Sequence, residues 1–600
     1  MTTTAASEVD TVAWDLDPLV DGEGAAGVDR LLEDARAAAE RAATRRGRLA
    51  EIDADEFLAL MQDLAAVQEA VGRAGSYASL RFAVDTGDPA NGALLSSVEE
   101  RANAIGNLLV FFTIEWCALD DDVVARLLAD PRLAFCHHHL EVMRLNRPYL
   151  LSEPEELILN EKSLTSTSAW VRLFSELDAA ITCDLDGEAV GLEAALSRLG
   201  HPDRSVRQAA HTAVTAGLEP GIRTRAFVFN TLLLDKATED RLRGLPTWIS
   251  SRNLDNEASD ASVEALVEAV RGRYDLPRRW YALKAKLLGL DRIADYDRMA
   301  SVADNEAEFH WGDARALVLD AYGSFSPELA TIAARFLTEP WIDAPVRPGK
   351  RPGAFCAYTT PTQHPYLLLN WTSKRRDVLT LAHEMGHGLH GYLAREQGVF
   401  HQSTPLTLAE TASVFGETVT FGLLLDATPD PNARLALLAE SLEGAIATVF
   451  RQTAMNRFES LVHTERREVG ELSVDRFNEL WVESQREMLG DSVEITDGYA
   501  SWWSYIPHFI ATPGYVYAYA YGQLLALAVY HQYEERGAAF VPQYLEMLRS
   551  GGSKSPEELG RIVGVDLADP AFWSGGLDIV ARQLDAAEAA AVAAGRLEVS

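Results

Sequence analysis

Leu381-Ala382-His383-Glu384-Met385-Gly386-His387 is the most informative stretch of this sequence. His383 and His387 are four residues apart, and on a helix this spacing puts both imidazoles on one face, near enough to share one tetrahedral ion. Glu384 follows the first histidine, where its carboxylate can reach a water molecule without being a ligand, which is the position of a general base. The apolar residues before the motif fall at helical spacing, and Thr372 or Ser373 can cap the start. The stretch therefore predicts a zinc-binding helix.

Two histidines leave a zinc ion short of a protein ligand, and a second helix is predicted downstream over residues 406–417. Glu410 and Glu417 lie two turns apart on nearly the same face of it. We expect Glu410 to be the third ligand and Glu417 to hold the other ring nitrogen of a ligand histidine, although the two roles could be exchanged. A surface helix carrying these residues by chance is the alternative. The flanking apolar residues predict burial, and a buried His-Glu-His cluster without a function would be costly.

Several segments resemble the oligoendopeptidase F branch of the thimet oligopeptidase superfamily of zinc peptidases, and they occur in the same order as in that family. They are Gly353–Cys356, Pro365–Thr372, Arg376–Val378, His383–His390, Ala409–Ser413, His508 and the tyrosine run from Tyr515. The resemblance covers the C-terminal half well and is weak before about residue 140. It implies a mostly α fold: a helical ellipsoid of two subdomains around a deep substrate channel, with a small β element near the zinc helix. Such a channel admits short peptides and excludes folded proteins.

A second catalytic segment is predicted over residues 502–522. Peptide hydrolysis builds negative charge on the carbonyl oxygen, and hydrogen-bond donors must be aimed at it. The resemblance assigns this task to His508 and to the tyrosine cluster. Tyr515 and Tyr519 share one helical face, and we expect them to be catalytic, with Tyr517 in reserve. The alternative is that the tyrosines only pack in a half-buried wall.

Composition narrows the class of protein. Apolar residues make up 48% and charged residues 24% of the chain, which is ordinary for a soluble globular protein. The formal charge of −35 disfavours nucleic acid and anionic membrane surfaces as partners. Residues 1–22 show no secretory signal, and the uncharged stretch 509–530 contains Pro513-Gly514 and five tyrosines, which predicts a buried segment rather than a membrane span. We expect a cytoplasmic protein.

The chain is too long for one compact core and predicts at least two subdomains. Helices are expected over 28–50, over 56–74 after an Asp53 cap, and over 91–113, and a hairpin over 181–190 that turns at Asp186-Gly187. We place a boundary near Gly200, which gives an N-terminal helical domain (1–200) and a catalytic domain (201–600). Residues 366–370 predict a short strand, either an edge strand that pairs with an extended substrate or an ordinary buried strand.

These observations predict a zinc-dependent endopeptidase that cuts short oligopeptides, with one ion held by His383, His387 and Glu410. A metallocarboxypeptidase is an alternative because the same metal site serves both reactions, but no cation for a terminal carboxylate is identified. A peptide-binding protein without catalysis is a second alternative, and Glu384 argues against it because a binder needs no base beside the metal. Cobalt or manganese could replace zinc on this ligand set. The sequence specifies neither side-chain preference nor oligomeric state.

Overall fold

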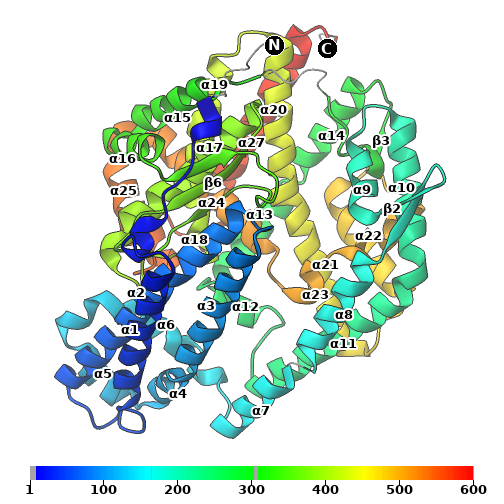
Figure 1. The fold of residues 1–600 in the computed structure, drawn as a ribbon. Coiled ribbons are helices and arrows are strands. Elements are labelled where there is room, and N and C mark those ends of the chain that lie inside the picture. The colour runs from blue at the N-terminus through cyan, green and yellow to red at the C-terminus, as the bar shows by residue number, and fades with distance from the viewer. Residues whose placement is uncertain (1–7, 164, 303–307, 599–600) are drawn as a thin grey trace. The chain divides into compact units, whose positions relative to one another are not determined.

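The structure is a computed structural model that describes residues 8–163, 165–302 and 308–598. Helices dominate it, and the strands form three small sheets among the described residues (Figure 1). The prediction of a mostly α fold with a small β element is confirmed.

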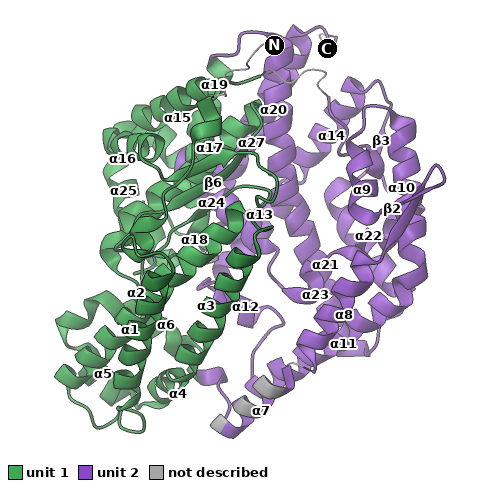
Figure 2. Cartoon of the chain, viewed as in Figure 1, with its two compact units in different colours: residues 1–147, 306–426, 532–566 green, residues 148–305, 427–531, 567–600 purple. Residues whose placement is uncertain are grey.

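The chain forms two compact units, each built from three separate segments (Figure 2). Unit 1 contains residues 1–147, 306–426 and 532–566, and unit 2 contains residues 148–305, 427–531 and 567–600. These units are defined by compactness alone and do not test where a domain begins or ends in the sequence. The division into 1–200 and 201–600 therefore remains a prediction.

Unit 1 carries the predicted metal motif. Its helices and strands are α1 (Ala25–Ala43), α2 (Ala54–Val84), α3 (Pro89–Asn107), α4 (Val110–Ala118), α5 (Asp121–Leu128), α6 (His137–Leu145), α15 (Trp311–Phe325), α16 (Pro327–Thr338), β4 (Ile342–Pro345), β5 (Phe355–Ala357), β6 (Tyr366–Trp371), α17 (Arg375–Ala394), α18 (Leu406–Ala409), α19 (Thr411–Asp426), α25 (Val541–Ser550) and α26 (Pro556–Ile562). The helices expected over 28–50 and 56–74 are present as α1, which ends earlier at Ala43, and α2, whereas the helix expected over 91–113 is divided into α3 and α4. The Asp53 side chain accepts a hydrogen bond from the Glu56 N–H at 2.8 Å, as expected of a cap.

Unit 2 carries the predicted aromatic segment. Its elements are α7 (Glu153–Ser163), α8 (Thr167–Ala179), β1 (Thr182–Leu185), β2 (Glu188–Gly191), α9 (Leu192–Ser197), α10 (Arg204–Leu218), α11 (Ile222–Arg243), α12 (Ser250–Asp255), α13 (Asp260–Arg271), α14 (Asp275–Leu287), β3 (Ile293–Ala294), α20 (Pro431–Ala445), α21 (Gln452–Val469), α22 (Val474–Leu489), β7 (Val493–Glu494), α23 (His508–Ala511), α24 (Tyr517–Arg536, whose end belongs to unit 1) and α27 (Pro570–Ala593). The predicted hairpin is confirmed as β1 and β2, which pair antiparallel. Asp186 and Gly187 both have positive φ, as a two-residue turn of this kind requires.

The strand predicted over 366–370 is β6, and it is not an edge strand. The three-stranded sheet has the order β4-β6-β5, with β6 parallel to β4 and antiparallel to β5. All residues of β6 except Asn370 are buried. The edge alternative is therefore wrong for this strand, because its two neighbours already use its backbone hydrogen-bonding groups on both sides. The sheet edges are β4 and β5.

Each unit has its own apolar core. In unit 1 the helices α1 and α2 pack together, and Tyr366 of β6 joins the cluster that they form with α3. In unit 2 one cluster joins α10, α11, α21 and α22 to Trp502 and Trp503 and reaches Phe509 and Val516. The segment that carries the predicted catalytic tyrosines is thus anchored by packing before and between the tyrosines.

One helical stretch, Thr407–Asp426, is long and apolar enough to cross a membrane by length and composition, and a second exists only if the sharply bent pair Pro89–Ala118 and Asp121–Leu128 counts as one span. Half of the apolar window of the first is buried inside the protein, and it carries Glu410 and Glu417. We interpret it as a core helix, because a buried helix inside a protein can be equally long and apolar. The absence of a membrane partner and the cytoplasmic location remain predictions.

Candidate metal centre and aromatic cluster

The helix α17 presents the two predicted metal ligands from its middle. It begins at Arg375, and the Asp377 carboxylate accepts hydrogen bonds from the backbone N–H groups of Thr372 and Lys374. The expected cap from Thr372 or Ser373 is therefore wrong. The N-cap residue is Lys374, which makes no side-chain cap hydrogen bond, and the carboxylate three residues into the helix instead reaches back to the amide of this N-cap residue.

Gly386 lies between the two histidines and lets α19 come close to α17. A Cβ atom built on Gly386 would lie 2.3 Å from the carbonyl oxygen of Ala412 and 2.5 Å from the Cα of Ser413. No side chain fits that gap, so glycine is required for the close approach. The two residues that Gly386 faces follow Glu410 in the chain, and the contact therefore sets where the Glu410 carboxylate lies.

The Glu410 carboxylate meets both histidines. Its Oε2 lies 3.2 Å from Nε2 of His383 and 3.4 Å from Nε2 of His387. Among the described residues, these three form the one group of histidine, cysteine and acidic side chains that could hold a metal ion. Glu410 ends the short helix α18, so the helix predicted over 406–417 is interrupted at the proposed ligand. Two imidazole nitrogens and one carboxylate oxygen are a donor set that suits zinc.

The geometry separates the two glutamates whose roles the sequence left open. Glu417 Oε2 lies 3.1 Å from Nδ1 of His383, on the side of the ring away from Glu410. Desolvation opposes charge in this cluster, but the ion pairs outweigh it, which lowers the pKa of Glu410 and raises the pKa of His383 to about 10. The Glu410 carboxylate therefore lies at Nε2 of His383, and the Glu417 carboxylate lies at Nδ1 of the same ring.

Glu384 is buried beside the metal group. Burial raises the pKa of its carboxyl, and the nearby histidines oppose this shift. The Glu384 charge adds to the desolvation that raises the pKa of the Cys356 thiol, and the edge strand β5, which carries Cys356, packs against α17. A carboxyl with a raised pKa is suited to accept a proton and give it back.

Two further residues support the metal group and were not expected from the sequence. The Ser413 hydroxyl donates to Oε2 of Glu410 at 2.7 Å, and the Tyr322 hydroxyl donates to the carbonyl of Ala382 at 2.8 Å. Ser413 follows Glu410 by three residues, a helical neighbour spacing that could have indicated the contact. Tyr322 is 60 residues from its partner, and no sequence pattern announces it.

In unit 2, His508, Tyr515 and Tyr519 form a partly exposed aromatic cluster. Nε2 of His508 lies 3.3 Å from the Tyr519 hydroxyl, and the His508 and Tyr515 rings stack with centroids 6.2 Å apart. The rings of Tyr515 and Tyr519 meet edge to face at 5.1 Å. Tyr515 lies in the turn before α24 rather than on the helix, but the turn brings its ring to the same side. Burial lowers the pKa of His508, which favours its neutral form.

Tyr517, the tyrosine held in reserve, lies elsewhere. Its side chain is fully buried, and its hydroxyl accepts a hydrogen bond from Nδ2 of Asn256 at 3.0 Å. Tyr521 is also fully buried, and its hydroxyl lies 3.3 Å from Oγ of Ser262. The helix α24 therefore buries Tyr517 and Tyr521 on one face and leaves Tyr519 partly exposed on another, as a helical period requires.

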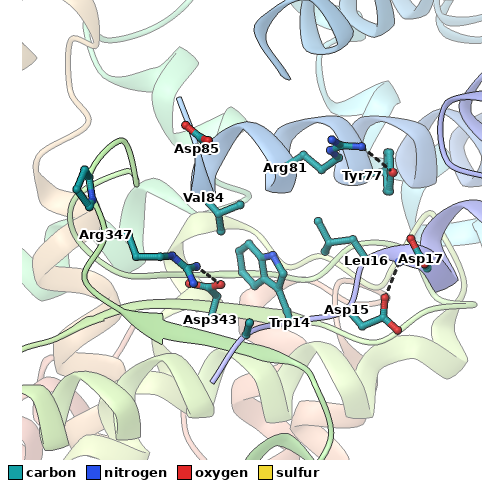
Figure 3. A pocket seen from close by; sticks show the side chains of 12 residues that line it. Trp14, Asp15, Leu16, Asp17, Tyr77, Arg81, Val84, Asp85, Asp343 and Arg347 are labelled. Atoms are coloured by element: carbon teal, nitrogen blue, oxygen red, sulfur yellow. Dashed lines mark hydrogen bonds and ion pairs between the residues drawn. The ribbon is translucent and has the colours of Figure 1, made fainter. Parts of the chain in front are cut away.

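A separate hollow, of about 570 Å³, lies in unit 1 (Figure 3). Trp14, Arg81 and Arg347 are among its lining residues, and none of the predicted site residues lines it. Arg347 is paired with Asp343, and Arg81 donates to the Tyr77 hydroxyl. The arginines in this hollow are thus already engaged with neighbouring side chains.

Comparison with known proteins finds family models that match two parts of the chain. The model of peptidase family M3 matches residues 327–579, and a model described as Oligopeptidase F matches residues 115–182. Oligopeptidase PepF of Bacillus subtilis (strain 168) is 28% identical over 538 residues, which cover 88% of this chain and 79% of that protein.

Solved structures share the fold. A crystal structure from Chlamydophila abortus is 21% identical, covers 96% of this chain and 98% of its own, and superposes with a TM-score of 0.85. The crystal structure of oligoendopeptidase-F from Enterococcus faecium is 23% identical, covers 95% and 99%, and has a TM-score of 0.70. At this identity the likeness concerns the fold alone.

Proposed function

The chain belongs to peptidase family M3 and is a peptide-hydrolysing metallopeptidase, and from this premise we propose that it is a zinc-dependent endopeptidase of short oligopeptides. One observation carries the proposal. Three ligand atoms of His383, His387 and Glu410 all lie within 4.8 Å of one another, and a buried glutamate adjoins them in sequence. This combination suits metal-assisted hydrolysis and has no evident structural purpose.

The three ligands would hold the ion, and Glu417 would fix the His383 ring. A histidine binds a metal ion through an unprotonated nitrogen, so Nε2 of His383 would be unprotonated and Nδ1 would carry the ring proton. Nδ1 would then donate a hydrogen bond to the Glu417 carboxylate, 3.1 Å away. When bound, zinc supplies Lewis acidity, which polarises the scissile carbonyl and lowers the pKa of water. The donor set of two imidazoles and a carboxylate fits this ion.

Glu384 would act as the general base. It takes a proton from the attacking water molecule and then gives it to the amine that leaves when the peptide bond breaks. Burial raises the pKa of the carboxyl and so favours the protonated state between these two transfers.

His508, Tyr515 and Tyr519 would donate hydrogen bonds to the carbonyl oxygen as its negative charge builds. Their partial exposure and mutual contacts support this role, while the Tyr517 hydroxyl is already engaged with Asn256. We assign the reserve tyrosine to packing.

Strand β5 would pair with the substrate. It lies at a sheet edge and packs against α17, the helix that carries Glu384. Main-chain hydrogen bonds from an edge strand tolerate many side chains, which would give broad specificity. The role that the sequence placed at residues 366–370 therefore moves to Phe355–Ala357.

The test is mass spectrometry of peptides of graded length after incubation with the protein, with and without a chelator. Internal cuts confined to short peptides, abolished by the chelator and restored by zinc, are expected. Stepwise loss of single C-terminal residues would replace the endopeptidase by a carboxypeptidase. Absence of any cleavage by protein with one bound zinc would overturn the proposal.

A further inference from the structure

The turn that carries Tyr515 is held by a buried carboxyl group from another helix. Glu459 lies in the middle of α21, has no solvent exposure, and accepts a hydrogen bond at Oε1 from the Gly514 N–H at 2.8 Å. Its Oε2 has no hydrogen-bond partner among the described residues. A buried carboxyl group that makes one hydrogen bond is costly to keep, so its contact with the turn calls for an explanation beyond packing.

The same turn is gripped from a second side by α12 and the residues before it. Nε of Arg252 donates to the carbonyl of Pro513 at 3.3 Å. Gly514 has φ +74°, and a Cβ atom there would lie 3.2–3.4 Å from Ile249, Arg252 and Trp248. The backbone angle would strain any other residue, and an added Cβ atom would press on these neighbours, so glycine suits this close approach.

From this turn the chain leads straight into the aromatic cluster. The Thr512 N–H donates to the His508 carbonyl at 3.0 Å, and the Tyr515 N–H donates to the Thr512 carbonyl at 3.1 Å. The Ala518 N–H then donates to the Tyr515 carbonyl at 2.9 Å, which begins the helix that bears Tyr519. Gly514 lies inside this series of hydrogen bonds, and its own N–H is used by Glu459 alone among the contacts described.

We propose that Glu459 is a positioning residue: its buried carboxyl group holds the Gly514 backbone and thereby fixes the Tyr515 ring against His508. This inference rests on the proposed function, because Tyr515 matters only if it meets the reacting carbonyl. Glu459 itself touches no substrate and acts through the turn.

The experiment compares Glu459→Met with Glu459→Gln in the zinc-loaded enzyme. Methionine fills the space without an acceptor, whereas glutamine keeps an oxygen at Oε1. We expect Glu459→Met to lower kcat by about tenfold or more with KM changed less than about twofold, and Glu459→Gln to restore most of the loss. Val270→Ala, a fully buried change on α13 outside the cluster that packs against Phe509 and Val516, is the control for simple destabilisation and should leave kcat unchanged. Wild-type kcat in Glu459→Met, or an equal loss in Val270→Ala, would overturn the proposal.

A double-mutant cycle identifies the path of the effect. If Glu459 acts through Tyr515, Glu459→Met costs little more in a Tyr515→Phe background, because the ring hydroxyl that it positions is already gone. Additive losses would contradict the proposal.

Hydrogen exchange of the 512–516 backbone, measured by mass spectrometry, tests the contact without activity. Protection should be kept in Glu459→Gln and lost in Glu459→Met, and equal protection in both would overturn the inference. If exchange responds as expected but Tyr515→Phe keeps full activity, the contact stands and the catalytic role of Tyr515 falls instead.

Discussion

The metal group and the aromatic cluster are built in opposite ways. The proposed metal ligands lie on α17 and at the junction between α18 and α19. The helices α17 and α19 are in direct contact, and Gly386 makes that contact so close that these side chains have little freedom. The aromatic cluster is carried by a turn between two helices, and the turn depends on one buried carboxyl group and one arginine. Close helix packing is thus enough to fix side chains on helices, whereas hydrogen-bond donors on a turn need additional contacts that hold the turn in place.

The largest expected effect is on the metal side. Glu384→Gln should lower kcat by about 100- to 10,000-fold, because the amide cannot take the proton from water. Zinc content, measured by elemental mass spectrometry, should stay at one ion per chain, which separates lost chemistry from a lost metal. Unchanged turnover would refute the general-base assignment.

Substitution of the two glutamates should separate ligand from support. Glu410→Ala should lose the ion, whereas Glu417→Ala should only weaken zinc affinity by about 10- to 100-fold, since it removes the carboxylate at Nδ1 of His383. Zinc titration against a competing chelator measures both affinities. The reverse order would exchange their roles.

The tyrosines should divide as the structure divides them. Tyr515→Phe and Tyr519→Phe should each lower kcat by about tenfold or more at full zinc content, through loss of a donor to the oxyanion. Tyr517→Phe should keep kcat and lose about 1 kcal/mol of stability, because Asn256 loses an acceptor. Steady-state kinetics and thermal unfolding report the two effects, and a kcat loss confined to Tyr517→Phe would invert the assignment.

Gly386→Ala tests the close packing of the metal helices. The new methyl group would press on the Ala412 carbonyl, so we expect a loss of about 1–3 kcal/mol in stability together with weaker zinc binding. Gly422→Ala is the matched control on α19, because no described atom lies within 4 Å of the place that its added methyl group would take. That variant should be as stable as the wild type or more so. Equal behaviour of the two variants would show that the close approach is unimportant.

The smallest effect concerns the clamp of the aromatic turn and depends on pH. Burial raises the pKa of Glu459 from 4.5 to about 8, so the folded protein keeps a proton that the unfolded chain loses above pH 4.5. The folded state then binds more protons between these values, and stability falls as pH rises from about 4.5 to 8. Glu459→Gln removes this penalty. Its gain in unfolding free energy over the wild type should grow by at least about 1 kcal/mol between pH 5 and pH 8.

A gain that is the same at both pH values would mean that Glu459 does not keep its proton in the folded state. The comparison requires unfolding curves of both proteins in the same buffers, because other groups contribute equally to both.

The sequence predicted the metal side better than the aromatic side for a physical reason. His383, Glu384 and His387 lie within one helical turn, so local periodicity alone brings them together. Glu410 lies on a second element of the chain. Only the packing of α19 on α17 shows that Glu410, rather than Glu417, lies near Nε2 of both histidines. Tyr515 and Tyr519 could be paired by periodicity, but the hydrogen-bond partner of the Tyr517 hydroxyl is Asn256, which is 261 residues away in the chain.

What the sequence missed lies in long-range contacts. The place of β6 in the middle of its sheet depends on β4 and β5, and short apolar strands carry no local sign of their neighbours. Glu459 looks like one more acid on an amphipathic helix until the turn at Gly514 is seen beside it. The start of α2 and the turn of the hairpin, in contrast, could be predicted, because the Asp53 cap and the Asp186-Gly187 turn act on residues next to them in the chain.

The interleaving of the two units has a consequence for synthesis. The α25 helix packs against the metal helix α17 but is translated about 150 residues later, on the order of 10–30 s at ordinary ribosome speeds. The proposed metal ligands His383 and His387 are therefore translated long before the last segment of unit 1. Unit 2 is complete only when α27 has been translated. Apolar surface of α17 stays uncovered during this interval, so the growing polypeptide is expected to need chaperones.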